Sequence, residues 1–312
     1  MRLTAIVPAT NQPATLGRCL AAIRAAAEPP DEVIVVDRPS TSGPAAARNA
    51  GALQAEGDVF VFVDADVVVH PDAFRRIRAA FRDDPELDAL FGSYDDSPAA
   101  PGVVSVFRNL LHHHVHQTSP GPAGTFWAGL GAVRREAFRR IEGFDAERFK
   151  APSVEDIELG MRLTANGGRI VLDPGLQGKH LKAWTTLSMV RTDLLARGIP
   201  WVGLLLQHRS SSGALNLGWR HRLSAGSSVV GVGALATQRL LLALLVPLLL
   251  LALNRRFYAL LLRRGGLLVL AAGLPLHALH HLTGVAAVPL GIAAHFGKAK
   301  APAAARLPTQ AG

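Results

Sequence analysis

Cysteine is almost absent from this chain, since Cys19 is the only one among 312 residues. A single thiol excludes an intrachain disulfide, and the sequence therefore fits a reducing compartment. A secretory leader is not expected either, because the apolar run at residues 3–7 is short and stops at Pro8. These features predict that the N-terminal part of the protein lies in the cytoplasm.

Acidic residues are missing from the last third of the chain, where none follows Asp193. Over the whole sequence, 33 Lys and Arg residues exceed 24 Asp and Glu residues and give a net charge of +9. A basic segment of this kind suits either an anionic membrane surface or a nucleic acid. The sequence has no zinc-finger pattern, RNP-like motif or basic repeat. We therefore expect a membrane partner and no nucleic acid.

Two long apolar stretches, at residues 229–253 and 265–294, follow this change in composition. Because about 20 apolar residues span a bilayer core, both stretches are long enough to cross it. A hairpin of two spans would put the four arginines between them outside, against the positive-inside tendency. These are Arg255, Arg256, Arg263 and Arg264. The sequence thus predicts membrane-embedded helices and leaves the number and orientation of spans open.

The first part of the chain alternates apolar runs with amphipathic segments. Buried strands are expected at Leu3–Val7, Glu32–Val36 and Val59–Val63, and helices at Thr15–Ala27, Pro44–Glu56 and Pro71–Phe81. Three such units in succession predict an α/β fold with a mostly parallel sheet flanked by helices. A further helix is expected at Ser153–Ala165, with Ser153 as its N-cap.

Acidic side chains stand where two of these strands end. Asp64 and Asp66 follow the run at residues 59–63, and Asp37 follows the second strand. Ligands of open α/β sheets bind at this edge, and carboxylates there attract hard divalent cations. The alternative is that these acids only form turns. We interpret them as a site for a metal ion and a nucleotide-linked substrate.

A second pair of acids, Glu155 and Asp156, begins the helix expected at residues 153–165. Acids in a first turn complement the helix dipole, and this structural explanation stays open. The functional interpretation is a general base that takes a proton from an acceptor hydroxyl.

Four histidines at positions 112, 113, 114 and 116 form a third candidate cluster. On a helix only His112 and His116 share a face, so a metal site is one interpretation and a solvated or membrane-facing segment is the other.

Taken in order, these motifs resemble the family 2 glycosyltransferases of the GT-A fold over residues 1–185. The resemblance rests on VIVVD at residues 33–37, ARNAG at 47–51, VFVDAD at 61–66, FWAGLGAVRREAFRRIEGFD at 126–145 and VEDIELGMRL at 154–163. It implies a Rossmann-like GT-A domain, followed here by an amphipathic interfacial connector at 186–228, membrane-embedded helices at 229–294 and a disordered tail at 295–312.

The resemblance also implies roles for individual residues. Asp156 would be the catalytic base and Glu155 would help to place it. Nucleotide-sugar contacts would come from Pro8, Ala9, Asn11, Asp37, Arg48 and Asp64; acceptor contacts from Phe126, Trp127 and Gly129; and metal ligands from Asp66, Asp64 and His180. The expected cofactor is a divalent metal, Mn²⁺ or Mg²⁺.

The chain departs from many relatives after the first two strands, where it has Asn11-Gln12 and Asp37-Arg38-Pro39-Ser40. It also lacks the Gln-x-x-Arg-Trp motif of processive synthases, which favours transfer of a single sugar. We expect an inverting glycosyltransferase that acts on a lipid or lipid-linked acceptor at the cytoplasmic face of the cell membrane. A soluble or polysaccharide acceptor, and a non-catalytic membrane scaffold, remain the alternatives.

Overall fold

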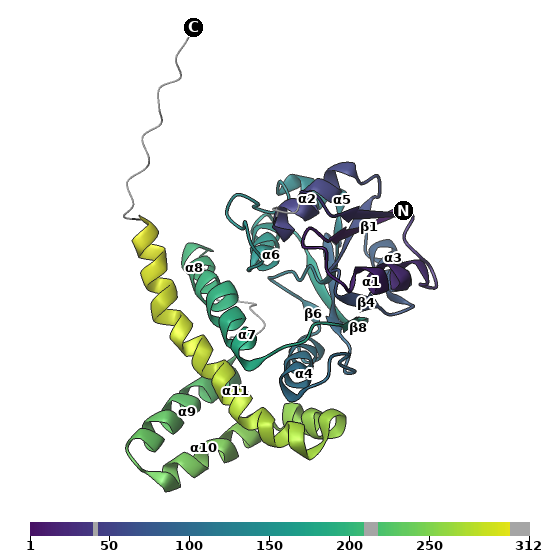
Figure 1. Cartoon of the computed structure of the whole chain (residues 1–312). Coiled ribbons are helices and arrows are strands. Elements are labelled where there is room, and N and C mark those ends of the chain that lie inside the picture. The colour runs from purple at the N-terminus through teal and green to yellow at the C-terminus, as the bar shows by residue number, and fades with distance from the viewer. Residues whose placement is uncertain (40–42, 209–217, 300–312) are drawn as a thin grey trace.

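The computed structural model describes residues 1–39, 43–208 and 218–299. Its strands form one sheet in the order β2-β1-β3-β7-β5-β8-β4, with β6 paired to β8 (Figure 1). The strands are β1 (Leu3–Pro8), β2 (Glu32–Val36), β3 (Val59–Val63), β4 (Val67–Val69), β5 (Ala89–Tyr94), β6 (Gly121–Pro122), β7 (Leu130–Arg134) and β8 (Ile170–His180).

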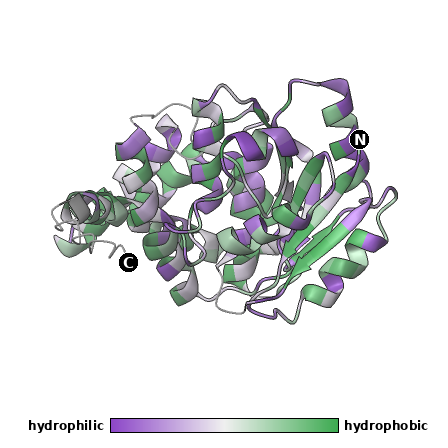
Figure 2. Cartoon of the chain, turned by 90° about the horizontal axis from the view of Figure 1, so that it is seen from above, coloured by the Kyte–Doolittle hydropathy of each residue, from purple (hydrophilic) through white to green (hydrophobic). Residues whose placement is uncertain are grey.

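The helices of the N-terminal part lie on both faces of this sheet. They are α1 (Leu16–Arg24), α2 (Pro44–Gln54), α3 (Ala73–Asp83), α4 (Val103–Gln117), α5 (Arg135–Arg140) and α6 (Glu155–Ala165). One apolar core joins α1 and α3 to one face of β1 and β3, and a second core joins α2, α5 and α6 to the other face. In Figure 2 the strands are mostly green, and the hydrophilic residues lie mainly on the surrounding helices and loops.

The sheet is mixed, whereas the sequence predicted a mostly parallel one. Strand β1 pairs in parallel with β2 and β3, as the repeated strand–helix units indicate. Strand β7 then runs antiparallel to both β3 and β5, and β4 runs antiparallel to β8. After residue 83 the sequence no longer alternates clearly between apolar runs and amphipathic segments, and β5 lies in that region. Strand β5 also pairs in parallel with β8, so parallel and antiparallel pairs alternate in the second part of the sheet.

The helix that carries Glu155 and Asp156 begins at Glu155, and Val154 is its N-cap residue. The predicted cap, Ser153, instead donates its hydroxyl hydrogen bond to the carbonyl of Ala196, over 2.7 Å. This hydrogen bond joins the start of α6 to the helical segment that follows the sheet. The capping prediction was wrong because the Ser153 hydroxyl binds a residue distant in the sequence instead of the first turn of its own helix.

After the sheet the chain is helical. The elements are α7 (Thr186–Arg191), a π-helix η1 (Thr192–Gly198), α8 (Ile199–His208), α9 (Trp219–Ala236), α10 (Leu240–Leu253) and α11 (Arg255–Ala299). The apolar stretch predicted at 229–253 is divided between α9 and α10, because the chain turns at Thr237–Arg239 with φ of 58° at Gln238. Helix α11 runs past His295 to Ala299, into the segment expected to be disordered. The rest of that tail, from residue 300, lies outside the described residues.

Within the described residues, α11 is the one helix long and apolar enough to cross a membrane. It bends at Gly266, where φ is 74°. Helix α10 is apolar but shorter.

Gly160 provides a test of how closely α6 packs against the sheet. A Cβ at this position would lie 2.3 Å from the backbone nitrogen of Phe126, so alanine must push α6 away from residues 125–126. We expect Gly160→Ala to lower the free energy of unfolding by about 1–3 kcal/mol, as overpacking does. The matched control is Gly17→Ala in α1, where nothing lies within 4 Å of the added carbon. Alanine there should be neutral or stabilising by up to about 1 kcal/mol. Equal unfolding free energies for the two variants would contradict the close packing of α6.

Candidate active site

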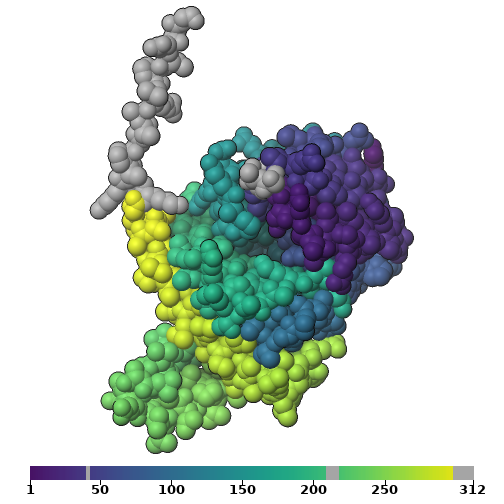
Figure 3. Space-filling model, viewed as in Figure 1, coloured from purple at the N-terminus to yellow at the C-terminus, as the bar shows by residue number. Residues whose placement is uncertain are grey.

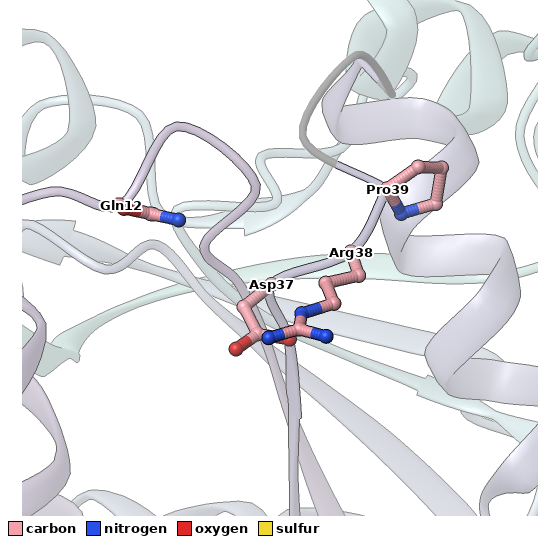
Figure 4. A pocket seen from close by; sticks show the side chains of 4 residues that line it. All are labelled: Gln12, Asp37, Arg38 and Pro39. Carbon is pink, nitrogen blue, oxygen red and sulfur yellow. The ribbon is translucent and has the colours of Figure 1, made fainter.

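The parallel strands β2, β1 and β3 end side by side at one edge of the sheet. Pro8 pairs with Val36, so the residues that follow these two strands are neighbours. Asp37 lines an open pocket of about 530 Å³ together with Gln12, Arg38 and Pro39 (Figure 4). In Figure 4 the side chain of Asp37 comes from the end of β2, and Gln12 comes from the loop after β1.

The predicted nucleotide residues near this pocket differ in exposure. Asn11 and Asp37 are exposed, whereas Ala9 is fully buried and donates its backbone N–H to Val36 O over 2.8 Å. Ala9 thus shapes the edge of the sheet through its backbone. The sequence did not single out Gln12, Arg38 and Pro39 as contacts, because here the chain departs from the pattern of its relatives.

Asp64, directly after β3, is held by Arg48. The Arg48 guanidinium donates to Asp64 Oδ1 over 2.8 Å and to Glu155 Oε1 over 2.9 Å. Its side chain is 5% exposed, so Arg48 lies beneath the site and is not free to contact a nucleotide. Glu155 also accepts the backbone N–H of Ser153. The ion pairs therefore join the end of β3 to the start of α6.

Asp66 lies beside His180 because β4 pairs with the end of β8. Val67 is opposite His180 in the ladder, and Asp66 Oδ2 is 3.5 Å from His180 Nε2. The imidazole stacks on the ring of Tyr94, with centroids 4.1 Å apart. The two predicted metal ligands are thus brought together by the sheet, and Tyr94 fixes the plane of the histidine.

The charge of Asp66 is retained at this position. Burial raises its pKa, but the hydrogen bond and charge of His180 and the charge of Lys182 outweigh burial and leave the pKa below its ordinary value. An ionised carboxylate beside an imidazole is a donor set that a divalent cation accepts.

The described residues contain no group of three His, Cys, Asp or Glu side chains that could hold a metal ion. The Asp66–His180 pair offers two donors, and the nearby Asp64 is engaged by Arg48. Two donors fit a cation that keeps several positions for waters and substrate phosphates. Because Mg²⁺ prefers oxygen ligands, the imidazole favours Mn²⁺.

Asp156 lies half-buried at the start of α6. Its carboxylate accepts the backbone N–H of Ala128 over 3.1 Å and that of Ile157 over 2.8 Å. Burial, together with the neighbouring charge of Glu155, raises the pKa of Asp156 to about 6. A carboxyl group with a pKa near neutrality is suited to accept and release a proton.

The segment 127–129 connects the two groups of acids. Asp64 donates its backbone N–H to Gly129 O over 3.1 Å, and Ala128 donates its backbone N–H to Asp156 Oδ2. The Trp127 indole lies over Gly129, where a Cβ would approach the ring to 2.4 Å. Phe126, in contrast, is 1% exposed and packs in the core, so only Trp127 of the predicted aromatic pair is partly exposed.

Several residues around Trp127 were missed from the sequence. Tyr94 and His112 pack against its ring at 4.9 Å and 4.7 Å between centroids. Burial lowers the pKa of His112 well below its usual value and that of His116 to about 4, so both are neutral at neutral pH. The interpretation of these two histidines as solvated was therefore wrong. Their spacing of four residues on α4 was the signal for a shared buried face.

Two exposed cations, Lys182 and Arg197, also act on the site. The Lys182 ammonium lies 4.3 Å from the centroid of the Trp184 ring and its charge lowers the pKa of Asp66. Arg197 follows Ala196, the residue bonded to Ser153, and its charge acts on Asp156. Neither residue was predicted to act on the site, because both belong to the part of the chain that follows β8.

A mixed sheet with helices on both faces and acidic residues at its strand ends is the architecture expected of a GT-A fold. Residues 38–142 match the family model "Glycosyl transferase family 2". This match covers about a third of the chain and agrees with the resemblance found in the sequence.

One solved structure with a TM-score above 0.5 supports this fold, and two others match with lower scores. Mannosyltransferase PcManGT from Pyrobaculum calidifontis, in complex with GDP-Man and Mn²⁺, matches with a TM-score of 0.52 and 17% identity over 95% of this chain and 87% of that chain. TarS 1–349 from S. aureus matches with a TM-score of 0.45 and 16% identity over 95% and 92%. GalNAc-T7 with UDP, GalNAc and Mn²⁺ matches with a TM-score of 0.46 and 14% identity over 73% and 51%. No curated protein matches this chain.

Proposed function

We propose that this protein is an inverting, metal-dependent glycosyltransferase that moves one sugar from a nucleoside-diphosphate sugar to a hydroxyl of a lipid or lipid-linked acceptor at the cytoplasmic face of a membrane. The observation that carries the proposal is the arrangement around residues 127–129. Asp64, two residues before the candidate metal ligand Asp66, donates its backbone N–H to Gly129 O, and Asp156, the candidate base, accepts the N–H of Ala128.

Each part of the site has a role in this reaction. Asp37 and Gln12 line the pocket for the nucleoside. Asp66 and His180 would hold the divalent metal, which supplies positive charge to the leaving diphosphate. Lys182 and Arg197 add positive charge on the same side.

The chemistry is one displacement. Asp156 takes the proton of the acceptor hydroxyl, the hydroxyl oxygen bonds to the anomeric carbon, and the bond between that carbon and the diphosphate oxygen breaks with its electron pair leaving on the diphosphate. Because attack comes from the face opposite the leaving group, the configuration inverts. Arg48 and Glu155 position Asp156 by fixing the start of α6.

The lipid acceptor is supported by the neighbours of Trp127. His112 of α4 packs on Trp127, and the same helix packs on α11 through Phe107 and Phe257, whose rings are 5.7 Å apart. The acceptor side of the site is therefore one helix away from the apolar C-terminal region. Membrane attachment through that region would present a lipid-linked hydroxyl close to Asp156.

A donor screen tests the proposal. Purified protein in detergent is incubated with GDP- and UDP-linked sugars, GDP-mannose first because the similar mannosyltransferase holds it, and nucleoside diphosphate release is measured. We expect release with at least one donor, faster with Mn²⁺ than with Mg²⁺, and abolished by EDTA and by Asp66→Ala. The matched control Asp83→Ala, at a side chain that is 68% exposed, should keep wild-type release. If neither EDTA nor Asp66→Ala changes the rate of nucleoside diphosphate release, the proposed role of a divalent metal at Asp66 is contradicted.

The pH dependence of kcat/KM tests the role of Asp156. The base must be ionised, and its pKa is raised to about 6. We therefore expect kcat/KM to be level above pH about 7 and to fall about tenfold per unit below about 6. A profile that stays level down to about pH 4, the ordinary range of aspartate, would contradict this assignment.

A further inference from the structure

Helices α9 and α10 form an apolar hairpin, residues 219–253, that projects from α11. Figure 3 shows it in green beneath the yellow helix, away from the purple and blue N-terminal part. The two helices pack through small buried residues of α9, and Gly231 faces Val246 at a distance that leaves little room for a side chain. These small residues are Ser224, Ser227, Ser228, Gly231 and Ala234.

The outward faces of the apolar hairpin are covered by large aliphatic side chains. On α10, Leu241 is 82% exposed, and Leu244 and Leu248 are 64% and 60% exposed. Val232 and Leu235 continue the surface on α9. Between Arg222 and Arg255, Arg239 at the turn is the one residue with a formal charge. A surface this apolar on two adjacent helices needs an apolar environment.

The apolar hairpin is too short to cross a bilayer. Helix α10 has 14 residues and is therefore about 21 Å long, against a hydrocarbon core of about 30 Å. Helix α9 has 18 residues, but its first turn carries Arg220 and Arg222, so its apolar length is similar. The turn at residues 237–239 thus falls short of the opposite surface.

The chain that leaves the apolar hairpin returns to the N-terminal part. The side-chain amide of Asn254 donates a hydrogen bond to Ser224 Oγ over 2.9 Å. This bond joins the end of α10 to the first part of α9, and we call this open end of the hairpin, opposite the turn at residues 237–239, its mouth. Three residues after Asn254, Phe257 packs on Phe107 of α4. Arg264 then donates to Asp96 Oδ2 over 2.7 Å, in the loop after β5. The arginines that follow α10 are therefore on the catalytic side.

The surface around the mouth of the apolar hairpin is strongly basic. Exposed arginines flank both ends, and no acidic residue occurs anywhere after Asp193. The exposed side chains are Arg220, Arg255, Arg256 and Arg263. Arginines at the end of an inserted segment match the anionic headgroups of a cytoplasmic leaflet.

From these features we propose that the apolar hairpin is a re-entrant anchor, which enters an anionic bilayer from the catalytic face and returns to that face without crossing. The proposal rests on the membrane attachment in the proposed function and specifies how it is made. It also removes the conflict of a two-span arrangement, because the arginines after α10 stay on the catalytic side.

Labelling of one introduced cysteine in the full chain tests the anchor. Cys19 is fully buried and does not compete for reagent. Thr237→Cys, at the turn, and Arg263→Cys, at the mouth, are compared in sealed membrane vesicles of both orientations with an impermeant maleimide. We expect Arg263→Cys to react only from the catalytic face, and Thr237→Cys to react from neither face until detergent is added. Reaction of Thr237→Cys from the opposite face would establish two spans, and reaction from the catalytic face would leave the hairpin in water; either result overturns the proposal.

Vesicle flotation gives a second readout. A variant carrying Leu241→Ser, Leu244→Ser and Leu248→Ser removes exposed side chains only, so its fold should be unchanged. We expect its bound fraction on phosphatidylglycerol-containing vesicles to fall at least about tenfold, since even one leucine contributes more than that factor when buried. The control Leu53→Ser, at an 89% exposed leucine of α2, should bind as wild type. If the triple variant instead dissociates a dimer and keeps its vesicle binding, the surface binds a second copy and the anchor is refuted.

The transferase proposal is judged separately in the same samples. Nucleoside diphosphate release in detergent should be equal in Thr237→Cys and the wild-type protein. Absence of release from both, with Thr237→Cys protected in vesicles, would refute the transferase and leave the anchor standing.

Discussion

Asp156→Asn is expected to reduce turnover at least about a hundredfold, the lower range of general-base contributions. Asparagine keeps the size of the side chain and one acceptor for the N–H groups of Ala128 and Ile157, but it cannot take a proton from the acceptor hydroxyl. The measurement is the rate of sugar transfer at saturating donor, with the donor dissociation constant determined in parallel. Donor affinity should change less than about threefold, because Asp156 acts on the acceptor.

Asp83→Asn is the matched control, since Asp83 is exposed on α3 and lies among surface charges. It should retain full turnover. Near-normal turnover of Asp156→Asn would remove this residue from the mechanism. A parallel loss of donor affinity would instead assign Asp156 to the nucleotide sugar.

Arg48→Met is expected to lower the free energy of unfolding by about 3–5 kcal/mol. The substitution leaves Asp64 and Glu155 without the cation that pairs with both, and breaking a buried ion pair from one side has this cost. The measurement is denaturant or thermal unfolding of the purified protein. Because the same pairs fix the start of α6, turnover should fall as well.

The control for this variant is Arg82→Met, at an arginine that is 73% exposed beside Asp83. A surface substitution of this kind should change the free energy of unfolding by no more than about 0.5 kcal/mol. Adding Glu155→Gln to Arg48→Met should recover part of the loss, because one of the two unpaired charges is then removed. Equal stability of Arg48→Met and Arg82→Met would show that the buried pairs do not hold the site together.

The first three strands were predictable because each is an uninterrupted apolar run that ends at a polar residue. β3, for example, is buried at every position. Strand β5 is also buried throughout, but it contains Gly92 and Ser93, so its sequence does not stand out as a strand. The Cβ of an alanine at residue 92 would lie 2.1 Å from Leu176 O, which explains the glycine by its neighbour on β8. Contacts of this kind are not visible in a local pattern.

The acids of the site were predictable from their positions at the ends of strands and helices, but their partners were not. Arg48 was expected to reach a nucleotide or phosphate, and it is instead buried between Asp64 and Glu155. The neighbours of Trp127 depend on where α4 packs, which the sequence between residues 83 and 124 leaves undetermined. Contacts between residues far apart in the sequence, such as Arg48 with Glu155, depend on how the strands and helices pack, and a local sequence pattern does not reveal this.

The apolar C-terminal region shows the same limit. Composition predicted membrane helices, but it treated residues 229–253 as continuous. The turn at Gln238 and Arg239 divides that stretch, and the polar pair was its only signal in the sequence. The length of each resulting helix, rather than the length of the apolar run, decides whether a bilayer can be crossed.

The most direct test of the central claim is a crystal structure with Mn²⁺ and the donor identified by the screen, with manganese located by its anomalous scattering. The account predicts a single strong peak in coordination contact with Asp66 and His180, the nucleoside beside Asp37, and the anomeric carbon facing Asp156. A nucleotide sugar bound away from these residues, or manganese bound elsewhere on the protein, would contradict it.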